Sequence, residues 1–209
     1  MGEALDSNPQ DVAGDTVELR ARARAGDRGA FQALYDRIAP SLYAWTQLRV
    51  QGGPAAGMDP QDLLQEVWMR ALRGLESYDP SLSFRRWIFG ITKNVFLQNL
   101  RASSRTVARG QLPLRRGASD SLNFPASVTS ISSRLAKDDL VQRFLAYVAE
   151  LPSEERQLVL YCGLEGYTSS QVAERLGILP DTALKRWQSL RARLRESGAL
   201  KALELEDVA

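Results

Sequence analysis

The chain has 209 residues, of which 44% are hydrophobic, so it is long enough for one or two domains with a buried core. It contains no histidine and one cysteine, Cys162; this excludes an internal disulfide and a Ser-His or Cys-His nucleophile and argues against a zinc site, so we expect no metal and no other cofactor. The net charge is only +2, no apolar run approaches the ~18 residues of a membrane span, and the N-terminus lacks the features of a signal peptide, which predicts a soluble, cytoplasmic protein without membrane insertion.

The N-terminal part of the chain is expected to be a disordered tail followed by two helices. Residues 1–18 are polar and acidic, a composition typical of disorder. A short helix is expected from Asp15 to Ala25, and Asp27 can cap the next one. Pro40 should kink this second helix or end its first half. The apolar residues at helical spacing in it are Phe31, Leu34, Tyr35, Ile38, Leu42 and Trp45.

A third helix is predicted to begin at Asp59 and Pro60, because aspartate is a favourable N-cap and proline fits the first helical position. Apolar residues recur along one side of this helix. Asp62, Gln65 and Glu66 fall largely on its other faces. These three residues form a polar ridge, and from the residues alone a solvated helix face is the simpler interpretation.

The next predicted helix, from Phe84 to about Arg105, lies in a stretch with no acid at all. No Asp or Glu occurs between Pro80 and Ser119. Such a block suggests a polyanionic partner, most simply nucleic acid, although charge alone leaves a solvated basic face as the alternative. Trp87 shares the spacing of the apolar residues, so we expect it in the core rather than stacked on a base. The bases in the block are Arg85, Arg86, Lys93, Arg101, Arg105, Arg109, Arg115 and Arg116.

Residues 107–133 lose helical periodicity, are rich in Ser, Gly and Pro, and predict a flexible linker. Helices resume near Arg134, and no segment shows the alternation of a β-strand. The expected fold is therefore all-α, with two helical domains over residues 19–106 and 134–200 and a short tail over residues 201–209.

The second domain contains a helix-turn-helix pattern over residues 167–195. Thr168 and Gln171 form a capping box for a short first helix, and Gly177 supplies the left-handed residue that ends it. Pro180 begins a second helix, which is basic and is of the kind that enters the major groove of DNA. A solvated basic helix in a bundle is the alternative. The bases of this helix are Lys185, Arg186, Arg191, Arg193 and Arg195.

Four sequence blocks occur in the order found in one protein family. They are AGDRGAFQALYDRI, DPQDLLQEVWMRALRGLESYDP, SFRRWIFGITKNVFLQNLR and ELPSEERQLVLYCGLEGYTSSQVAERLGI. With these blocks the chain resembles a bacterial RNA polymerase sigma factor of the extracytoplasmic-function (ECF) type of the sigma-70 family, over most of residues 19–200. The resemblance implies a transcription initiation factor, not an enzyme. Such a factor binds core RNA polymerase, directs it to promoters and helps to melt the −10 region.

The resemblance also implies partners and the residues that contact them. The polar ridge would dock on the clamp helices of the polymerase's largest subunit through Asp62, Gln65 and Glu66. Region 2 would bind the −10 element, with Asn94 at the pocket for an extruded base and charges on the strand backbone at Arg85, Arg86, Lys93 and Arg101. Region 4 would bind the −35 element through Thr182, Lys185, Arg186, Arg191 and Arg193. The family further implies an anti-sigma factor that occludes these surfaces.

Three departures from the family pattern limit how far individual −35 contacts carry over. Leu179 stands where a small polar residue usually precedes the recognition helix, and Trp187 replaces an aliphatic residue. After Thr182 the chain has Ala183-Leu184-Lys185, where a Val-Lys-Ser run is common. Two other functions stay open: a helix-turn-helix regulator whose residues 19–106 sense a signal, and a sigma-like adaptor that titrates an anti-sigma factor. The acid-free helix argues against the first, and basic residues in both halves argue against the second. An enzyme is disfavoured, since Glu154 and Glu155 are best explained as first-turn charges of a helix.

Overall fold

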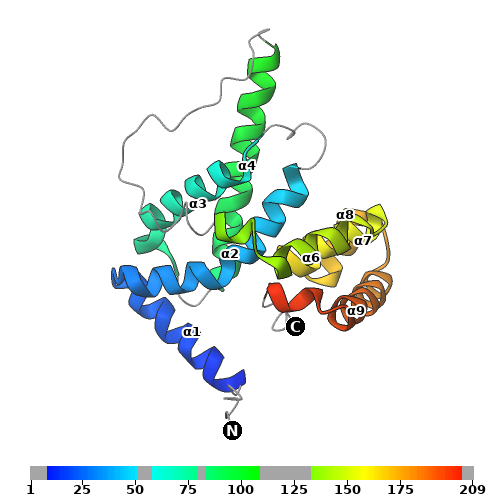
Figure 1. The fold of residues 1–209 in the computed structure, drawn as a ribbon, viewed down its shortest axis with the longest axis horizontal. Coiled ribbons are helices and arrows are strands. Elements are labelled where there is room, and N and C mark those ends of the chain that lie inside the picture. The colour runs from blue at the N-terminus through cyan, green and yellow to red at the C-terminus, as the bar shows by residue number, and fades with distance from the viewer. Residues whose placement is uncertain (1–8, 51–57, 80–82, 109–132, 204–209) are drawn as a thin grey trace.

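The computed structural model describes residues 9–50, 58–79, 83–108 and 133–203. In these ranges it contains helices and no strand, so the all-α prediction is confirmed (Figure 1). The elements are α1 (Pro9–Arg24), α2 (Arg28–Val50), α3 (Pro60–Gly74), the 3-10 helix η2 (Leu75–Ser77), α4 (Phe84–Ala108), α6 (Asp139–Ala149), α7 (Ser153–Leu158), the π-helical segment η3 (Val159–Leu164), α8 (Ser169–Leu176), α9 (Pro180–Glu196) and the 3-10 helix η4 (Ala199–Ala202).

Helices α1 to α4 pack around an aromatic cluster. Helix α2 contacts α1, α3 and α4. The ring of Trp68 lies 4.7 Å from that of Phe31 and 4.5 Å from that of Tyr35, measured between centroids. Phe84 joins them at 6.1 Å from Phe31. Aromatic contacts at these spacings add stabilisation beyond simple area burial. Trp87 lies at the periphery of this core, where it is partly buried and packs against Phe84, so its predicted role in packing is confirmed.

Several predicted helix boundaries are confirmed by the capping contacts in the structure. The Asp59 carboxylate accepts from the amide of Gln61 at 2.8 Å. The Asp27 carboxylate accepts from the amide of Ala30, and this hydrogen bond, together with Arg22, lowers the pKa of Asp27. Local side-chain-to-backbone bonds of this kind depend only on neighbouring residues, which explains why the sequence reveals them.

Other predictions about the first helices need correction. Helix α1 begins at Pro9 rather than at Asp15, so residues 9–18 of the expected tail are helical, while residues 1–8 lie outside the described residues. Pro40 lies inside α2 and does not end it. Figure 1 shows the axis of α2 changing direction between its two halves, in agreement with the expected kink. Helix α4 continues to Ala108, three residues past the expected end.

The helix-turn-helix forms as predicted. The Thr168 hydroxyl accepts from the amide of Gln171 at 3.3 Å, and the Gln171 side chain accepts from the amide of Thr168 at 3.1 Å. Gly177 has a φ of +65°, the left-handed value that favours glycine. Leu179 precedes α9 without a side-chain cap, as expected of leucine. The predicted tail from residue 201 is wrong at its start, because Leu203 is fully buried and η4 packs against α6.

The unusual Trp187 is accommodated by a glycine on the facing segment. Trp187 lies on the buried side of α9, with an exposed fraction of 9%. A Cβ added to Gly163 would come within 3.0 Å of the ring atom Cη2 of Trp187. Gly163 and Trp187 therefore depend on each other, because the indole occupies the space that a side chain at position 163 would fill.

We expect Gly163→Ala to lower the free energy of unfolding of the C-terminal helices by about 1–3 kcal/mol through overpacking. Adding Trp187→Leu should make the effect of Gly163→Ala smaller, since the clash is then removed. Urea unfolding followed by circular dichroism measures all four proteins of this cycle. Gly90→Ala is the matched control, because Gly90 lies in helix α4 with nothing within 4 Å of the added carbon. Equal effects of Gly163→Ala with and without Trp187 would contradict the packing argument.

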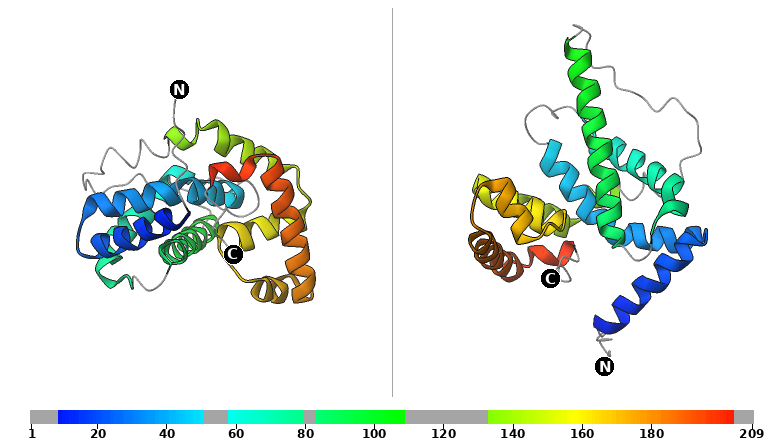
Figure 2. Two further views of the ribbon diagram at one scale, coloured as in Figure 1. Left: turned by 90° about the horizontal axis from the view of Figure 1, so that it is seen from below. Right: turned by 180° about the vertical axis from the view of Figure 1, so that it is seen from behind.

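The C-terminal helices lie on one side of α2 and α4, away from α1 and α3 (Figures 1 and 2). Helix α2 contacts both α6 and η3. The Ser41 hydroxyl donates to the backbone oxygen of Leu203 at 3.1 Å. The two groups of helices therefore meet in a specific interface, which bears directly on the predicted site residues.

Candidate nucleic-acid interface

The polar ridge of α3 lies on the surface, and its central carboxylate is held in place by α4. Asp62 is exposed, while Gln65 and Glu66 are partly exposed. The Glu66 carboxylate accepts from the guanidinium of Arg70 and, at 3.0 Å, from the side-chain amide of Asn99. The sequence does not reveal the role of Asn99, because this residue contacts Glu66 only once α3 and α4 have packed together.

Helix α4 presents its predicted DNA-binding residues on different sides. Because successive residues are ~100° apart around a helix, Arg85 and Asn94, nine positions apart, point in opposite directions. Arg86, Asn94 and Arg101 are exposed. Arg85 and Lys93 are partly buried and face the C-terminal helices. The five predicted residues are therefore not one continuous surface in this structure.

Arg85 is bound at the end of η3. Its Nη2 donates to the backbone oxygens of Gly163 and Leu164 at 3.0 and 3.1 Å. These carbonyls lie in the last turn of a helical segment, where they lack partners within the helix and carry the negative end of the helix dipole. The guanidinium also lies over the ring of Phe89, 5.3 Å from its centroid. Arg85 thus closes the end of a helix from the other half of the chain.

Glu165, in the turn between η3 and α8, is the centre of this interface. Its side chain is only 2% exposed. One carboxylate oxygen accepts from the indole nitrogen of Trp45 and from Arg49, each at 2.8 Å. The other lies 3.4 Å from the ammonium nitrogen of Lys93, which also donates to the hydroxyl of Tyr167 at 3.0 Å. We call these four residues, Glu165, Trp45, Arg49 and Lys93, the Glu165 cluster.

Local patterns in the sequence do not reveal Glu165 and Arg49. These two residues contact each other across 116 positions, and Glu165 contacts Trp45 across 120, so no local spacing connects them. The one available indication is that Glu165 follows the apolar stretch Leu158–Leu164 without a base nearby. An acid in such a position needs a partner from elsewhere in the fold if it is buried.

The basic helix α9 is tied to α7 by two ion pairs. Arg186 pairs with Glu154 at 2.7 Å, and Arg193 pairs with Glu155 at 2.6 Å. Lys185 is exposed, whereas Thr182 and Arg191 are partly buried. Pairs at an exposed surface are worth about 0–1 kcal/mol and exchange readily for other partners. The predicted −35 residues thus share one helix, but two of them have acidic partners within the chain.

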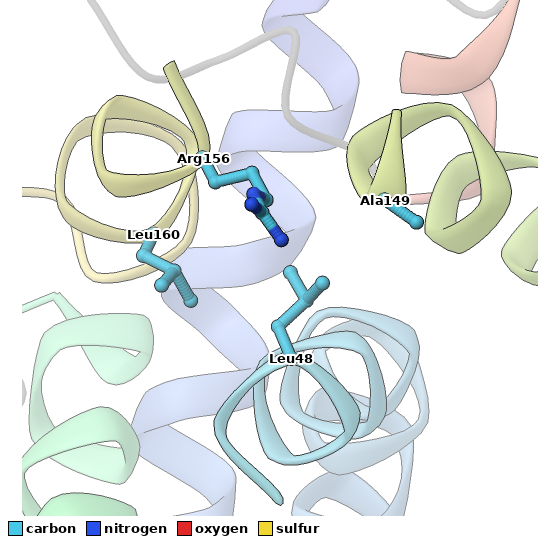
Figure 3. A pocket seen from close by; sticks show the side chains of 4 residues that line it. All are labelled: Leu48, Ala149, Arg156 and Leu160. Atoms are coloured by element: carbon cyan, nitrogen blue, oxygen red, sulfur yellow. The ribbon is translucent and has the colours of Figure 1, made fainter. Parts of the chain in front are cut away.

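A cavity of about 100 Å³ lies at the junction of the two helix groups, between α2, α6 and the α7–η3 segment (Figure 3). Its lining includes Leu48, Ala149, Arg156 and Leu160. This volume is small for an organic cofactor. Among the described residues, no group of three or more His, Cys, Asp or Glu side chains could hold a metal ion. No helix in the described ranges has the length and apolar character needed to cross a membrane.

Two family models match the chain, and together they cover more than half of it. Sigma-70 region 2 matches residues 34–106, which hold most of α2 and all of α3 and most of α4. Sigma-70, region 4 matches residues 142–186, from α6 into α9. The two matches follow the order of the two helix groups, and each contains part of the predicted DNA-binding surface.

Relatives with known names match over most of their length. ECF RNA polymerase sigma factor SigM of Mycobacterium tuberculosis is 28% identical over 85% of this chain and 82% of that protein. RNA polymerase sigma factor CarQ of Myxococcus xanthus is 28% identical over 88% of this chain and 97% of its own. The solved structure of CnrH in complex with the cytosolic domain of CnrY has a TM-score of 0.43 and 20% identity, and the match covers 87% of this chain and 96% of that one.

Proposed function

The chain belongs to the ECF type of the sigma-70 family of RNA polymerase sigma factors, and from this we infer how its surfaces divide the work of promoter recognition. It is a promoter-specific transcription initiation factor, as members of this family are. The observation that supports the division most directly is the occurrence of both family regions, in order, on two separate helix groups. We propose that the chain itself catalyses no covalent step and acts in the cytoplasm.

In this proposal, residues 19–106 form region 2 and residues 134–200 form region 4, with residues 107–133 as the linker between them. Two DNA-binding modules on a tether can reach two promoter elements that neither module could span alone. The polar ridge of α3, with Asp62, Gln65 and Glu66, docks on the clamp helices of the polymerase's largest subunit. The exposure of this ridge and its attachment to α4 through Asn99 support that assignment.

The exposed side of α4 is proposed to bind the −10 region. Asn94 has both a donor and an acceptor in one short side chain, as recognition of an extruded base requires. Arg86 and Arg101 are exposed on the same helix and are proposed to contact the strand backbone. Arg85 and Lys93, on another side of α4, are proposed to contact the strand backbone once the C-terminal helices have moved away.

Helix α9 is proposed to bind the −35 element. Lys185 and Arg186 are exposed basic residues in the first half of the helix, and Thr182 lies one turn before Arg186. Arg186 would exchange its exposed partner Glu154 for a phosphate, since exposed ion pairs contribute little on their own. Arg193, whose partner Glu155 is partly buried, is proposed to do the same. Arg191 completes the proposed set.

We expect Arg186→Ala to lower the magnitude of the salt slope of −35 binding by about 0.9, the value for one lost phosphate contact. If Arg186 contacts a base instead, the substitution should change which −35 sequences are preferred. Fluorescence anisotropy on duplexes at several salt concentrations measures the slope. Glu154→Gln is the matched control, because it breaks the same ion pair but keeps the arginine. A variant with wild-type slope and preference would show that Arg186 serves only to pair with Glu154.

An anti-sigma factor is proposed as a further partner, as expected for this family. Run-off transcription with purified core polymerase on a promoter library tests the function as a whole. We expect transcription from a subset of promoters with shared −35 and −10 sequences, and none from core polymerase alone. A chain that does not bind core polymerase in a titration under the same conditions would overturn the proposed function.

A further inference from the structure

The face of the N-terminal helices that holds Glu165 includes two residues proposed for promoter binding. Lys93 belongs to the Glu165 cluster, and Arg85 binds the carbonyls of Gly163 and Leu164 immediately before it. Both belong to the helix proposed to contact the −10 strand. Residues 163–167 thus occupy, from within the same chain, basic groups that a DNA strand would otherwise use.

The contact is made by charge and hydrogen bonds as much as by apolar packing. Two cations and an indole N–H converge on a carboxylate that is almost completely removed from water. A buried carboxylate is tolerated only while its partners surround it, so removing one partner leaves an uncompensated charge. The stability of the closed arrangement therefore depends strongly on Glu165. The ion pairs between α9 and α7 are more exposed, so losing one of them costs less.

The same contact is imperfect, as expected of an interface that must open. The Nε of Arg49 is buried without a hydrogen-bond partner. A buried unpaired donor lowers the net stability of the closed form, because its lost hydration is not replaced. The closed form also holds the C-terminal helices against α2 and α4, whereas two promoter elements separated along DNA require modules that move apart.

We propose that residues 163–167 form an intramolecular clasp, which binds region 4 to the Trp45, Arg49, Arg85 and Lys93 face of region 2 and blocks the −10 strand from that face. The clasp opens when the two regions engage separate sites. This inference rests on the proposed function for the role of Arg85 and Lys93. Its structural part, the closed state held by Glu165, stands independently of that function.

The closed state can be measured on the full chain in solution. Donor and acceptor dyes on Ala25→Cys and Glu174→Cys, both at exposed positions, report the distance between the two helix groups by energy transfer. The native Cys162 is 3% exposed, and burial raises its pKa to about 11, so it stays unlabelled near neutral pH. Glu165→Gln and Arg49→Gln should each decrease energy transfer, while Glu150→Gln, at an exposed acid of the C-terminal helices, should leave it unchanged.

A second readout tests whether the clasp blocks DNA. The apparent affinity for a labelled single-stranded oligothymidine should rise about tenfold in Glu165→Gln and Arg49→Gln, since the competent fraction no longer limits binding. Unchanged energy transfer in both variants would overturn the proposal. So would decreased energy transfer without any gain in DNA binding, because the contact would then be structural only. Thermal unfolding by circular dichroism identifies a variant that has simply lost its fold, and the other variant then decides the outcome.

The outcome separates this inference from the proposed function. If Glu165→Gln and Arg49→Gln open and bind DNA more tightly, but the wild-type chain fails to bind core polymerase, the clasp stands and the proposed function is overturned. If the wild-type chain supports normal run-off transcription, but neither variant opens, the proposed function stands and the clasp is overturned.

Discussion

Replacing Glu66 with lysine should weaken binding to core polymerase by at least tenfold, or about 1.4 kcal/mol. Glu66 lies in the middle of the α3 ridge, and its carboxylate is fixed by Arg70 and Asn99. Charge reversal removes an oriented hydrogen-bond acceptor and places a cation opposite the polymerase groups that would face the carboxylate. Placing like charges opposite each other costs several kcal/mol of binding free energy at many interfaces. A titration of labelled sigma factor with core polymerase measures the loss.

The control for this prediction is Glu76→Lys, a reversal at an exposed acid in η2 outside the ridge. Helicity should stay nearly unchanged in Glu66→Lys, since one repulsive i,i+4 pair with Arg70 costs only about 0.2–0.5 kcal/mol. Asn99→Ala should give a smaller loss of polymerase binding, because it frees the Glu66 carboxylate without removing it. Core binding as tight as the wild type in Glu66→Lys would remove the ridge from the polymerase contact.

Asn94→Ala should reduce open-complex formation on a duplex promoter by about tenfold, within the 1–3 kcal/mol typical of a specific base contact. Extruding a base costs a few kcal/mol of stacking and pairing, so a lost contact appears first as poor melting. Permanganate footprinting detects the melted bases. Asn94 is exposed, and the expected loss is therefore one of function rather than of folding.

A template already mismatched across the −10 region separates melting from base recognition. On this template the melting part of the Asn94→Ala defect should shrink, while any loss of −10 preference should persist. Gln142→Ala, which removes an exposed amide from α6, is the control. Wild-type melting and preference in Asn94→Ala would exclude Asn94 from the proposed pocket.

The parts of the fold that the sequence predicts are those set by neighbouring residues. Asp59, the pair Thr168 and Gln171, and Gly177 each act within one helical turn, and all four behave as expected. The acidic composition of the N-terminal residues predicts a later start for α1 than the structure has, because composition does not show that this helix packs on α2.

The parts that the sequence does not predict are contacts between distant segments. Glu165 meets Trp45 across 120 positions, and Asn99 meets Glu66 across 33. Helical periodicity places each of these residues on a face of its own helix but does not say which other helix covers that face. The absence of acids in α4 likewise does not show which of its faces is covered. In the structure Arg85 and Lys93 contact the C-terminal helices, whereas Asn94 is exposed to solvent.

The position of Trp45 makes the state of the interface visible to spectroscopy without any added label. Its indole is 1% exposed, its N–H donates a hydrogen bond to the Glu165 carboxylate, and the guanidinium of Arg49 lies over it, 5.3 Å from the ring centroid. Indole emission depends on the local field and on access of water, and separation of the two helix groups changes both at once. Trp68 and Trp87 pack against aromatic rings of the N-terminal helices, and Trp187 packs on Gly163 within the C-terminal helices. A change in tryptophan emission on addition of core polymerase would therefore report whether the two helix groups separate at Trp45.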